Sequence, residues 1–109
     1  MIEGSIAVIC PSRDRPQGLL ATYQSMVNTT TNPMMIACID EDQRELYAAV
    51  PEGDRLKFRI GRREPVCTLV NRAVEDYPDF AIYVMMIDDA RYVTPGWDQW
   101  LLATFDRFP

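Results

Sequence analysis

The sequence contains no histidine, and Lys57 is its single lysine. The absence of histidine excludes a Ser-His-Asp triad, a Cys-His nucleophile pair and a His-ligated zinc site. A phosphate-binding loop with the motif G-x-x-x-x-G-K-[ST] is excluded as well, because no such motif surrounds Lys57. The sequence also lacks G-x-G-x-x-G, the fingerprint of dinucleotide-binding proteins. Several common schemes of catalysis and nucleotide binding are therefore ruled out.

Basic residues are outnumbered by acidic ones. The chain has 11 Lys plus Arg against 16 Asp plus Glu, which gives a net charge of −5. Proteins that bind nucleic acids need a surplus of cations to contact the phosphates, so we do not expect nucleic acid as a partner.

Long apolar runs are missing too. No stretch approaches the roughly 20 residues that cross a bilayer, and no basic segment precedes the first apolar run, as it would in a signal peptide. Cysteine is scarce: Cys10, Cys38 and Cys67 form no C-x-x-C pair, and each lies in an apolar segment. We therefore expect a cytoplasmic protein without a membrane span, in which the cysteines are small buried hydrophobic residues.

The remaining composition is that of an ordinary globular domain, with 48% apolar and 25% charged residues. A chain of 109 residues has the usual length of one domain. It is long enough to bury about two-thirds of the surface that it would expose when unfolded. We expect residues 1–109 to form a single domain.

Four short apolar runs predict the strands of a sheet. They are residues 5–10 (SIAVIC), 34–39 (MMIACI), 56–60 (LKFRI) and 81–87 (AIYVMMI). The first, second and fourth are almost continuously apolar, which is typical of strands covered on both faces. The third alternates through Lys57 and Arg59, which is typical of a half-exposed edge strand. We therefore predict a parallel sheet with the first run in the centre, between the second and the fourth.

Four segments with helical periodicity alternate with these runs. Pro16 opens a helix that ends before residues 28–33, and Asp42 with Glu45 resembles the capping box of a second helix that ends at Pro51. The third helix runs from Pro65 to Pro78, and the fourth begins at Trp97 and carries a stripe of Trp97, Trp100, Leu101, Phe105 and Phe108. Alternating strands and helices predict a three-layer, Rossmann-like α/β fold with right-handed crossovers.

Charged residues cluster in the loops that follow the four predicted strands. These loops are residues 11–16 (PSRDRP), 40–42 (DED), 61–64 (GRRE) and 88–91 (DDAR). The carboxyl ends of parallel strands share one edge of the sheet, which is where ligands bind in this class of fold. Carboxylates bind hard divalent cations and guanidinium groups bind phosphates, so this edge suits a phosphate-bearing ligand with a metal ion. The alternative is solvated charge, with Asp42 as a helix cap and Arg13 and Arg15 paired with nearby carboxylates.

Asp88 and Asp89 form the most informative pair in these loops. Two adjacent acids directly after an apolar strand repel each other. A bound cation would compensate for this repulsion.

Five short segments follow one another along the chain, one of them, Asn71-Arg72-Ala73, on the third predicted helix. The other four are Pro11-Ser12-Arg13-Asp14-Arg15-Pro16, Ile39-Asp40-Glu41-Asp42, Ile87-Asp88-Asp89-Ala90 and Thr94-Pro95-Gly96-Trp97-Asp98. In this order the segments resemble the nucleotide-binding half of GT-A glycosyltransferases, and they are most similar to family 2-like members. The resemblance covers essentially the whole chain. It implies an enzyme that moves a sugar from a nucleoside diphosphate sugar to an unidentified acceptor.

The resemblance also implies roles for individual residues. The loop of residues 11–15 and Asp40 would hold the base and ribose of the donor. Asp88-Asp89-Ala90 stands in the place of the family's D-x-D motif, whose acids meet the ribose and a Mg²⁺ or Mn²⁺ bound to the pyrophosphate. Such a cation offsets the charge that develops on the leaving nucleoside diphosphate. The implied nucleotide-sugar-binding residues are Pro11, Ser12, Arg13, Arg15, Asp40, Asn71 and Asp88, and the implied metal ligands are Asp88 and Asp89.

Two features depart from the family pattern. Ala90 stands where the second acid of D-x-D belongs, so either Asp89 serves as a metal ligand in its place or the metal site is weakened. The sequence stops at Pro109, whereas the family's acceptor-binding portion and the catalytic base of its inverting members lie further on. We therefore expect a donor-binding half, and the sequence assigns no catalytic residue.

Two other functions stay open. A non-catalytic module that binds a nucleotide sugar would account for Ala90 and for the missing acceptor-binding portion. An interaction domain would account for the aromatic stripe of residues 97–108, which a second copy of the chain or another partner could cover.

Overall fold

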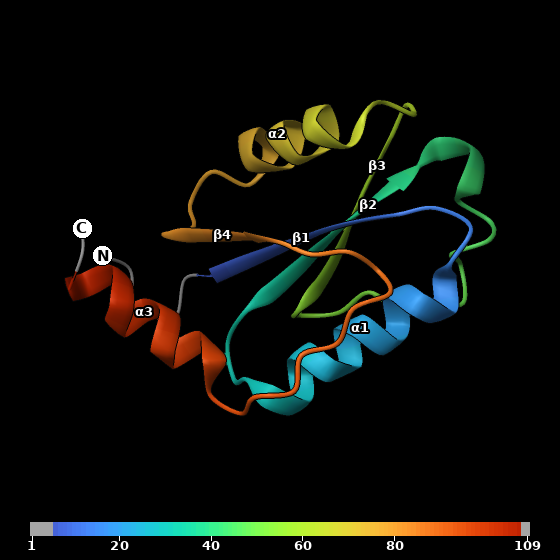
Figure 1. Cartoon of the computed structure of the whole chain (residues 1–109). Helices are drawn as coiled ribbons and strands as arrows, with labels where there is room; N and C mark the ends of the chain where they lie inside the picture. Colours follow the sequence, from blue (N-terminus) through green and yellow to red (C-terminus); the bar gives the residue numbers. More distant parts are fainter. Residues whose placement is uncertain (1–5, 108–109) are drawn as a thin grey trace.

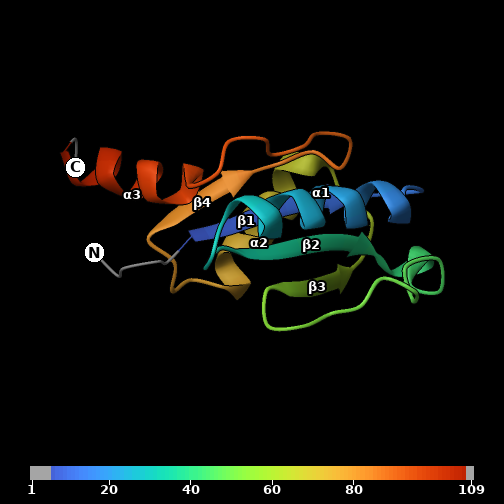
Figure 2. The ribbon, with the colours of Figure 1, turned by 90° about the horizontal axis from the view of Figure 1, so that it is seen from below.

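Four parallel strands form the sheet of the computed structural model, which describes residues 6–107 (Figure 1). The strands are β1 (Ile6–Ser12), β2 (Met34–Asp40), β3 (Leu56–Gly61) and β4 (Ile82–Met85), in the spatial order β3-β2-β1-β4 (Figure 2). In the register of the sheet, Ala7 pairs with Met34 and with Tyr83. The predicted parallel sheet is confirmed, with β1 between β2 and β4 and with β3 at an edge.

Three α-helices connect or follow the strands. They are α1 (Pro16–Thr29), α2 (Val66–Asp76) and α3 (Trp97–Arg107), as predicted from the proline and periodicity signals. Pro16 occupies the first turn of α1, where its missing N–H leaves no hydrogen bond unmade. Phe108, the last residue of the predicted aromatic stripe, lies outside the described residues. None of the helices in residues 6–107 is long and apolar enough to cross a membrane.

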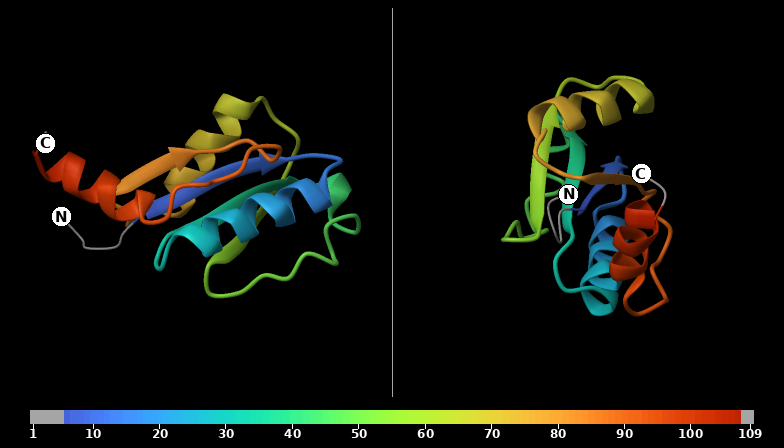
Figure 3. Two further views of the ribbon diagram at one scale, coloured as in Figure 1. Left: turned by 60° about the horizontal axis from the view of Figure 1, so that its bottom comes forward. Right: turned by 90° about the vertical axis from the view of Figure 1, so that its left-hand side faces the viewer.

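The helices pack on both faces of the sheet (Figure 3). Because successive side chains of a strand point to opposite faces, Ile6, Val8 and Cys10 of β1 contribute to one cluster, whereas Ala7 and Ile9 contribute to the other. The first cluster also contains Leu19 and Met26 of α1 and Leu102 of α3, and the second contains Leu69 and Ala73 of α2. Each large apolar side chain buried in this way contributes roughly 1.5–3 kcal/mol. The fold is therefore α/β with an all-parallel sheet, which is consistent with a Rossmann-like fold.

The predicted helix between Asp42 and Pro51 is wrong. A short 3₁₀ helix, η1 (Glu41–Gln43), is followed by turns up to residue 50. Tyr47 and Val50 still reach the core, as the apolar pattern required, but they do so from turns. The capping pattern failed because the side chain of Asp42 binds Arg13 and is not free to cap a helix.

The fourth strand differs from its prediction in length and in burial. β4 ends at Met85, and the side chains of Met85 and Ile87 are 55% and 58% exposed. Among the described residues, β4 pairs with β1 alone, so it is an edge strand, as the predicted strand order implies. A continuous apolar run therefore did not mean burial on both faces here.

The cysteines match their prediction only in part. Cys10 and Cys38 are buried in the two strands at the centre of the sheet, as expected. Cys67 is exposed in the first turn of α2, because the stripe of this helix that faces the sheet runs through Leu69 and Ala73.

Alkaline pH is expected to destabilise the fold through the two buried thiols. Burial raises the pKa of Cys10 to about 12 and that of Cys38 to about 11, from 9.0 for an exposed thiol. Above pH 9 the unfolded chain loses these protons while the folded chain keeps them. The free energy of unfolding should therefore fall by about 1.4 kcal/mol per pH unit for each thiol. Denaturant titrations between pH 9 and pH 11 measure this decline.

Cys67 provides the control for this experiment, because its thiol is exposed. Cys67→Ala should leave the pH dependence unchanged, whereas Cys10→Ala combined with Cys38→Ala should make it shallower. An equally steep decline in both variants would show that other groups cause it.

Candidate functional site

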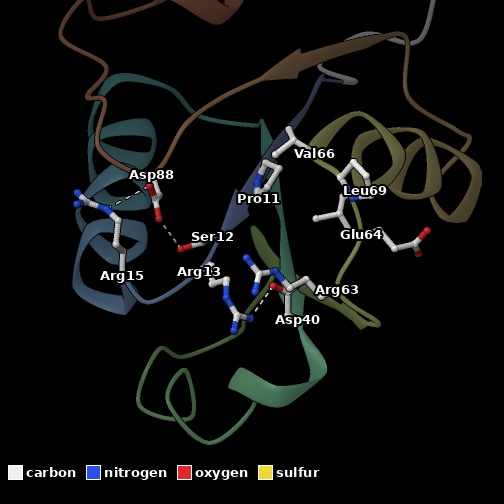
Figure 4. Close-up of a pocket in the computed structure, with 11 residues that line it drawn as sticks. Pro11, Ser12, Arg13, Arg15, Asp40, Arg63, Glu64, Val66, Leu69 and Asp88 are labelled. Carbon is white, nitrogen blue, oxygen red and sulfur yellow. Dashed lines mark hydrogen bonds and ion pairs between the residues drawn. The ribbon is translucent and has the colours of Figure 1, made fainter.

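A pocket of about 580 Å³ lies at the carboxyl ends of β1 and β2, between the loop after β1 and the N-terminus of α2 (Figure 4). It is lined by Pro11, Ser12, Arg13, Arg15, Asp40, Arg63, Glu64, Pro65, Val66, Leu69 and Asp88. Every predicted nucleotide-sugar-binding residue except Asn71 is in this lining. The structure thus brings together residues that the sequence places in separate loops.

Arg13 connects the loop after β1 to the end of β2. Its Nη1 donates to Oδ2 of Asp40 at 2.9 Å, and its two terminal nitrogens bind the two carboxylate oxygens of Asp42 at 2.8 Å each. The hydrogen bonds to Asp42 and Asp40 raise the pKa of Arg13, and the same contact lowers the pKa of Asp42. Asp40 is only 5% exposed, so this ion pair provides the partner that a buried carboxylate requires.

Asp88 is held by two residues of the loop after β1. Ser12 Oγ donates to Oδ2 of Asp88 at 2.7 Å, and Nε of Arg15 lies 3.2 Å from Oδ1 (Figure 4). Both carboxylate oxygens therefore already have a partner. This arrangement joins the loop after β4 to the loop after β1, although their residues are far apart in the sequence.

Gln43 and Tyr47, to which the sequence assigned no role in the site, hold the loop after β1 in place through hydrogen bonds. Gln43 accepts a hydrogen bond from the backbone N–H of Asp14 at 2.6 Å and donates one to the carboxylate of Asp14. Asp14 has a φ of 60°, which a residue other than glycine adopts only where its surroundings support it. The hydroxyl of Tyr47 contacts Ser12 Oγ at 2.5 Å and accepts from the backbone N–H of Arg15 at 3.1 Å. In the sequence, Tyr47 matched only the pattern of an apolar helix face, which gave no indication that its hydroxyl makes hydrogen bonds.

The wall opposite the loop comes from α2 and the loop before it. Pro65, Val66 and Leu69 provide apolar surface, and Glu64 is paired with Arg72 at 2.8 Å. Arg63 makes no hydrogen bond or ion pair with the described residues, although its charge helps to lower the pKa of Asp42. It is therefore the lining guanidinium that is available to an anionic ligand.

Asn71 and Asp89 lie outside the pocket. Asn71 is exposed on α2, two positions from both Leu69 and Ala73, which places it on the opposite side of the helix from the sheet. Asp89 is exposed in the loop after β4 and does not line the pocket. Within residues 6–107, no group of three or more acidic or cysteine side chains is arranged to hold a metal ion. A divalent cation at Asp88 would have to share this carboxylate with Ser12 and Arg15.

No protein-family model matches the sequence, and no curated protein matches it.

Gly18 fixes the distance between α1 and the loop after β4. A Cβ atom at this position would lie 2.7 Å from the backbone oxygen of Asp88 and 3.2 Å from Nη2 of Arg15. No side chain fits at that distance from a backbone atom. The glycine thus lets the first turn of α1 approach the backbone of Asp88, which lines the pocket.

Replacing Gly18 by alanine is expected to destabilise the protein, although alanine is the better helix former. The added methyl group must push away the backbone of Asp88, and such overpacking costs about 1–3 kcal/mol. Chemical denaturation of Gly18→Ala measures the loss. Gly53→Ala is the matched control, because a Cβ atom at Gly53 meets nothing within 4 Å. A Gly18→Ala variant as stable as the wild type would contradict the contact.

Proposed function

We propose that the pocket binds a nucleoside diphosphate sugar, and that the chain is the donor-binding part of a metal-assisted glycosyltransferase with a three-layer GT-A fold. The observation that carries this proposal is the combination of an apolar wall, a buried carboxylate and three guanidinium groups in one pocket. Its volume of about 580 Å³ lies within the range of small-molecule sites. The resemblance described above supports the same class of ligand.

The base and ribose of the donor fit the side of the pocket near α2. Pro11, Val66 and Leu69 provide apolar surface there, against which a flat ring can pack. Asp40 lies in the same lining and is an acceptor for an N–H group of a base or for a ribose hydroxyl. A buried carboxylate discriminates strongly, because a ligand without a matching donor leaves it short of hydrogen bonds.

The phosphates fit the arginine side of the pocket. Arg13 forms ion pairs with three carboxylates and Arg15 with one, whereas Arg63 has no such partner among the described residues. Arg63 can therefore bind a phosphate without first breaking an ion pair. Guanidinium groups next to the leaving diphosphate would also stabilise the negative charge that develops when the sugar departs.

In the proposed function, a divalent cation would bind at Asp88, with Asp89 as the neighbouring acid. When bound, it would supply further positive charge to the diphosphate. Each oxygen of Asp88 already has one partner, so a cation would have to share the carboxylate with Ser12 and Arg15 or displace Arg15 from Oδ1. The metal-dependent part of binding is therefore expected to require Asp88, and Asp88→Asn should remove it.

Titration calorimetry with UDP and GDP, each with and without Mn²⁺, tests the proposal. Arg63→Ala should weaken binding about three- to tenfold, because an exposed charge-assisted hydrogen bond contributes somewhat less than the roughly 1.5–3 kcal/mol of a buried one. Arg62→Ala is the matched control, since Arg62 is the adjacent arginine and does not line the pocket. The proposal fails if neither nucleotide binds at millimolar concentration, or if both variants lose affinity equally.

A non-catalytic nucleotide-sugar-binding module is the alternative within the same site. Ala90, in the place of the second acid of the D-x-D motif, favours it. This alternative predicts binding of the intact donor without release of its sugar. Release of free sugar from a bound UDP-sugar would favour the enzyme.

A second candidate function, association of two copies of the chain, is favoured by exposed apolar side chains on β4, on α3 and in the segment between them. Met85, Ile87, Val93, Trp100 and Phe105 are all exposed there. Trp97, by contrast, is used internally: it stacks on Tyr92 with ring centroids 4.3 Å apart and donates to Thr29. The exposed edge of β4 carries no charged residue, unlike β3 with Lys57 and Arg59, so nothing on it opposes pairing with another strand. An edge strand is complementary to the same edge of a second copy, which makes a second copy the proposed occupant.

Light scattering at micromolar concentration tests this association. The wild-type chain should be dimeric, and Trp100→Ser should shift it toward the monomer, because Trp100 is 67% exposed and is one of these apolar side chains. Leu46→Ser is the matched control, since Leu46 is exposed in the turns after η1 and not near β4. A monomeric wild-type chain would overturn the candidate.

A further inference from the structure

Tyr47 is fully buried and does not line the pocket, yet its hydroxyl contacts both residues that hold Asp88. Its oxygen lies 2.5 Å from Ser12 Oγ and 3.1 Å from the backbone nitrogen of Arg15. Ser12 binds one oxygen of Asp88, and the side chain of Arg15 binds the other. Any action of Tyr47 on a ligand must therefore pass through these two residues.

The chemistry of the groups fixes the direction of each hydrogen bond in this chain. The backbone N–H of Arg15 can only donate, so the oxygen of Tyr47 accepts there. The carboxylate of Asp88 can only accept, so Ser12 uses its single hydrogen toward Asp88. The hydrogen between Tyr47 and Ser12 must then come from Tyr47. Burial raises the pKa of Tyr47, which keeps this hydrogen in place at neutral pH.

The directed chain limits the freedom of Asp88. With Tyr47 donating to its oxygen, Ser12 keeps its own hydrogen on Asp88, because turning that hydrogen toward Tyr47 would set two hydrogens against each other. The bond from the backbone N–H of Arg15 to Tyr47 holds the segment from which the Arg15 side chain reaches Asp88. Without the Tyr47 hydroxyl, both partners of the carboxylate would be less restrained.

We propose that Tyr47 is a positioning residue that orients the carboxylate of Asp88 for the ligand, through Ser12 and through the backbone of Arg15. The nature of the ligand in this inference rests on the proposed function. The orientation of Asp88 by Tyr47 is independent of it. It gives the segment after η1 a role in the site, although no residue of that segment lines the pocket.

Tyr47→Phe tests the proposal, because it removes the hydroxyl and keeps the ring in the core. Tyr92→Phe is the matched control: the hydroxyl of Tyr92 is buried without a hydrogen-bond partner among the described residues, and Tyr92 does not line the pocket. In the ligand-free protein, the carboxyl carbon resonance of Asp88 should shift in Tyr47→Phe and stay unchanged in Tyr92→Phe. An unchanged resonance in Tyr47→Phe would overturn the proposal, whether or not a nucleotide binds.

Calorimetry with UDP and GDP gives the second readout. Tyr47→Phe should weaken the binding of whichever nucleotide the wild type binds by about five- to twentyfold, and Tyr92→Phe should not weaken it. In a Ser12→Ala background, Tyr47→Phe should cost clearly less, because the chain to Asp88 is already broken. Equal losses in both backgrounds, or a loss of stability without a loss of affinity, would assign Tyr47 a purely structural role.

The outcomes separate this inference from the proposed function. If the wild type binds neither nucleotide but the Asp88 resonance responds to Tyr47→Phe, the proposed function fails and the positioning role stands. If Tyr47→Phe does not fold, Ser12→Ala interrupts the same chain one bond nearer to Asp88. It must then shift the Asp88 resonance and speed the exchange of the Tyr47 hydroxyl hydrogen, and the absence of either change overturns the inference.

Discussion

The site depends on the hydrogen bonds that hold the loop after β1 against the segment after β2. This loop turns through Asp14 at a positive φ, a backbone conformation that costs free energy unless its surroundings support it. Gln43 supports it by binding both the backbone and the side chain of Asp14, and Asp42 binds the guanidinium of Arg13. These contacts restrain the loop after β1 in the ligand-free protein, which would reduce the entropy that binding of the proposed ligand must overcome.

Charge is arranged in pairs around the pocket, in a protein whose net charge is −5. Asp40 is paired with Arg13, Asp88 with Arg15 and Glu64 with Arg72, so each acid of the lining has its own guanidinium. A buried carboxylate such as Asp40 is tolerated because its guanidinium partner offsets part of the cost of removing it from water. Among the described residues this pairing also leaves Arg63 as the lining guanidinium without a carboxylate partner, which is the charge that the proposed anionic ligand would meet.

The outcome for individual elements shows which sequence patterns were decisive. The uninterrupted apolar run of residues 34–39 and the lysine and arginine of residues 56–60 correctly indicated a central and an edge strand. The apolar run of residues 81–87 failed as an indicator of burial, because an edge strand with an exposed apolar surface has the same composition as a buried one. The capping pattern at Asp42 failed because Arg13, which is remote in the sequence, competes for the same carboxylate.

The sequence by itself determined the four strands and three of the four predicted helices, since apolar periodicity and proline positions act over a few residues. It also placed charged loops at the carboxyl edge of the sheet, and with them Arg13, Asp40 and Asp88. Only the tertiary structure decided which side chains face one another: it turned Asn71 and Asp89 away from the pocket and brought Arg63 into its lining and Tyr47 beneath Ser12. The physical reason is that side-chain direction and contacts across tens of residues depend on how the elements pack, which no local pattern encodes.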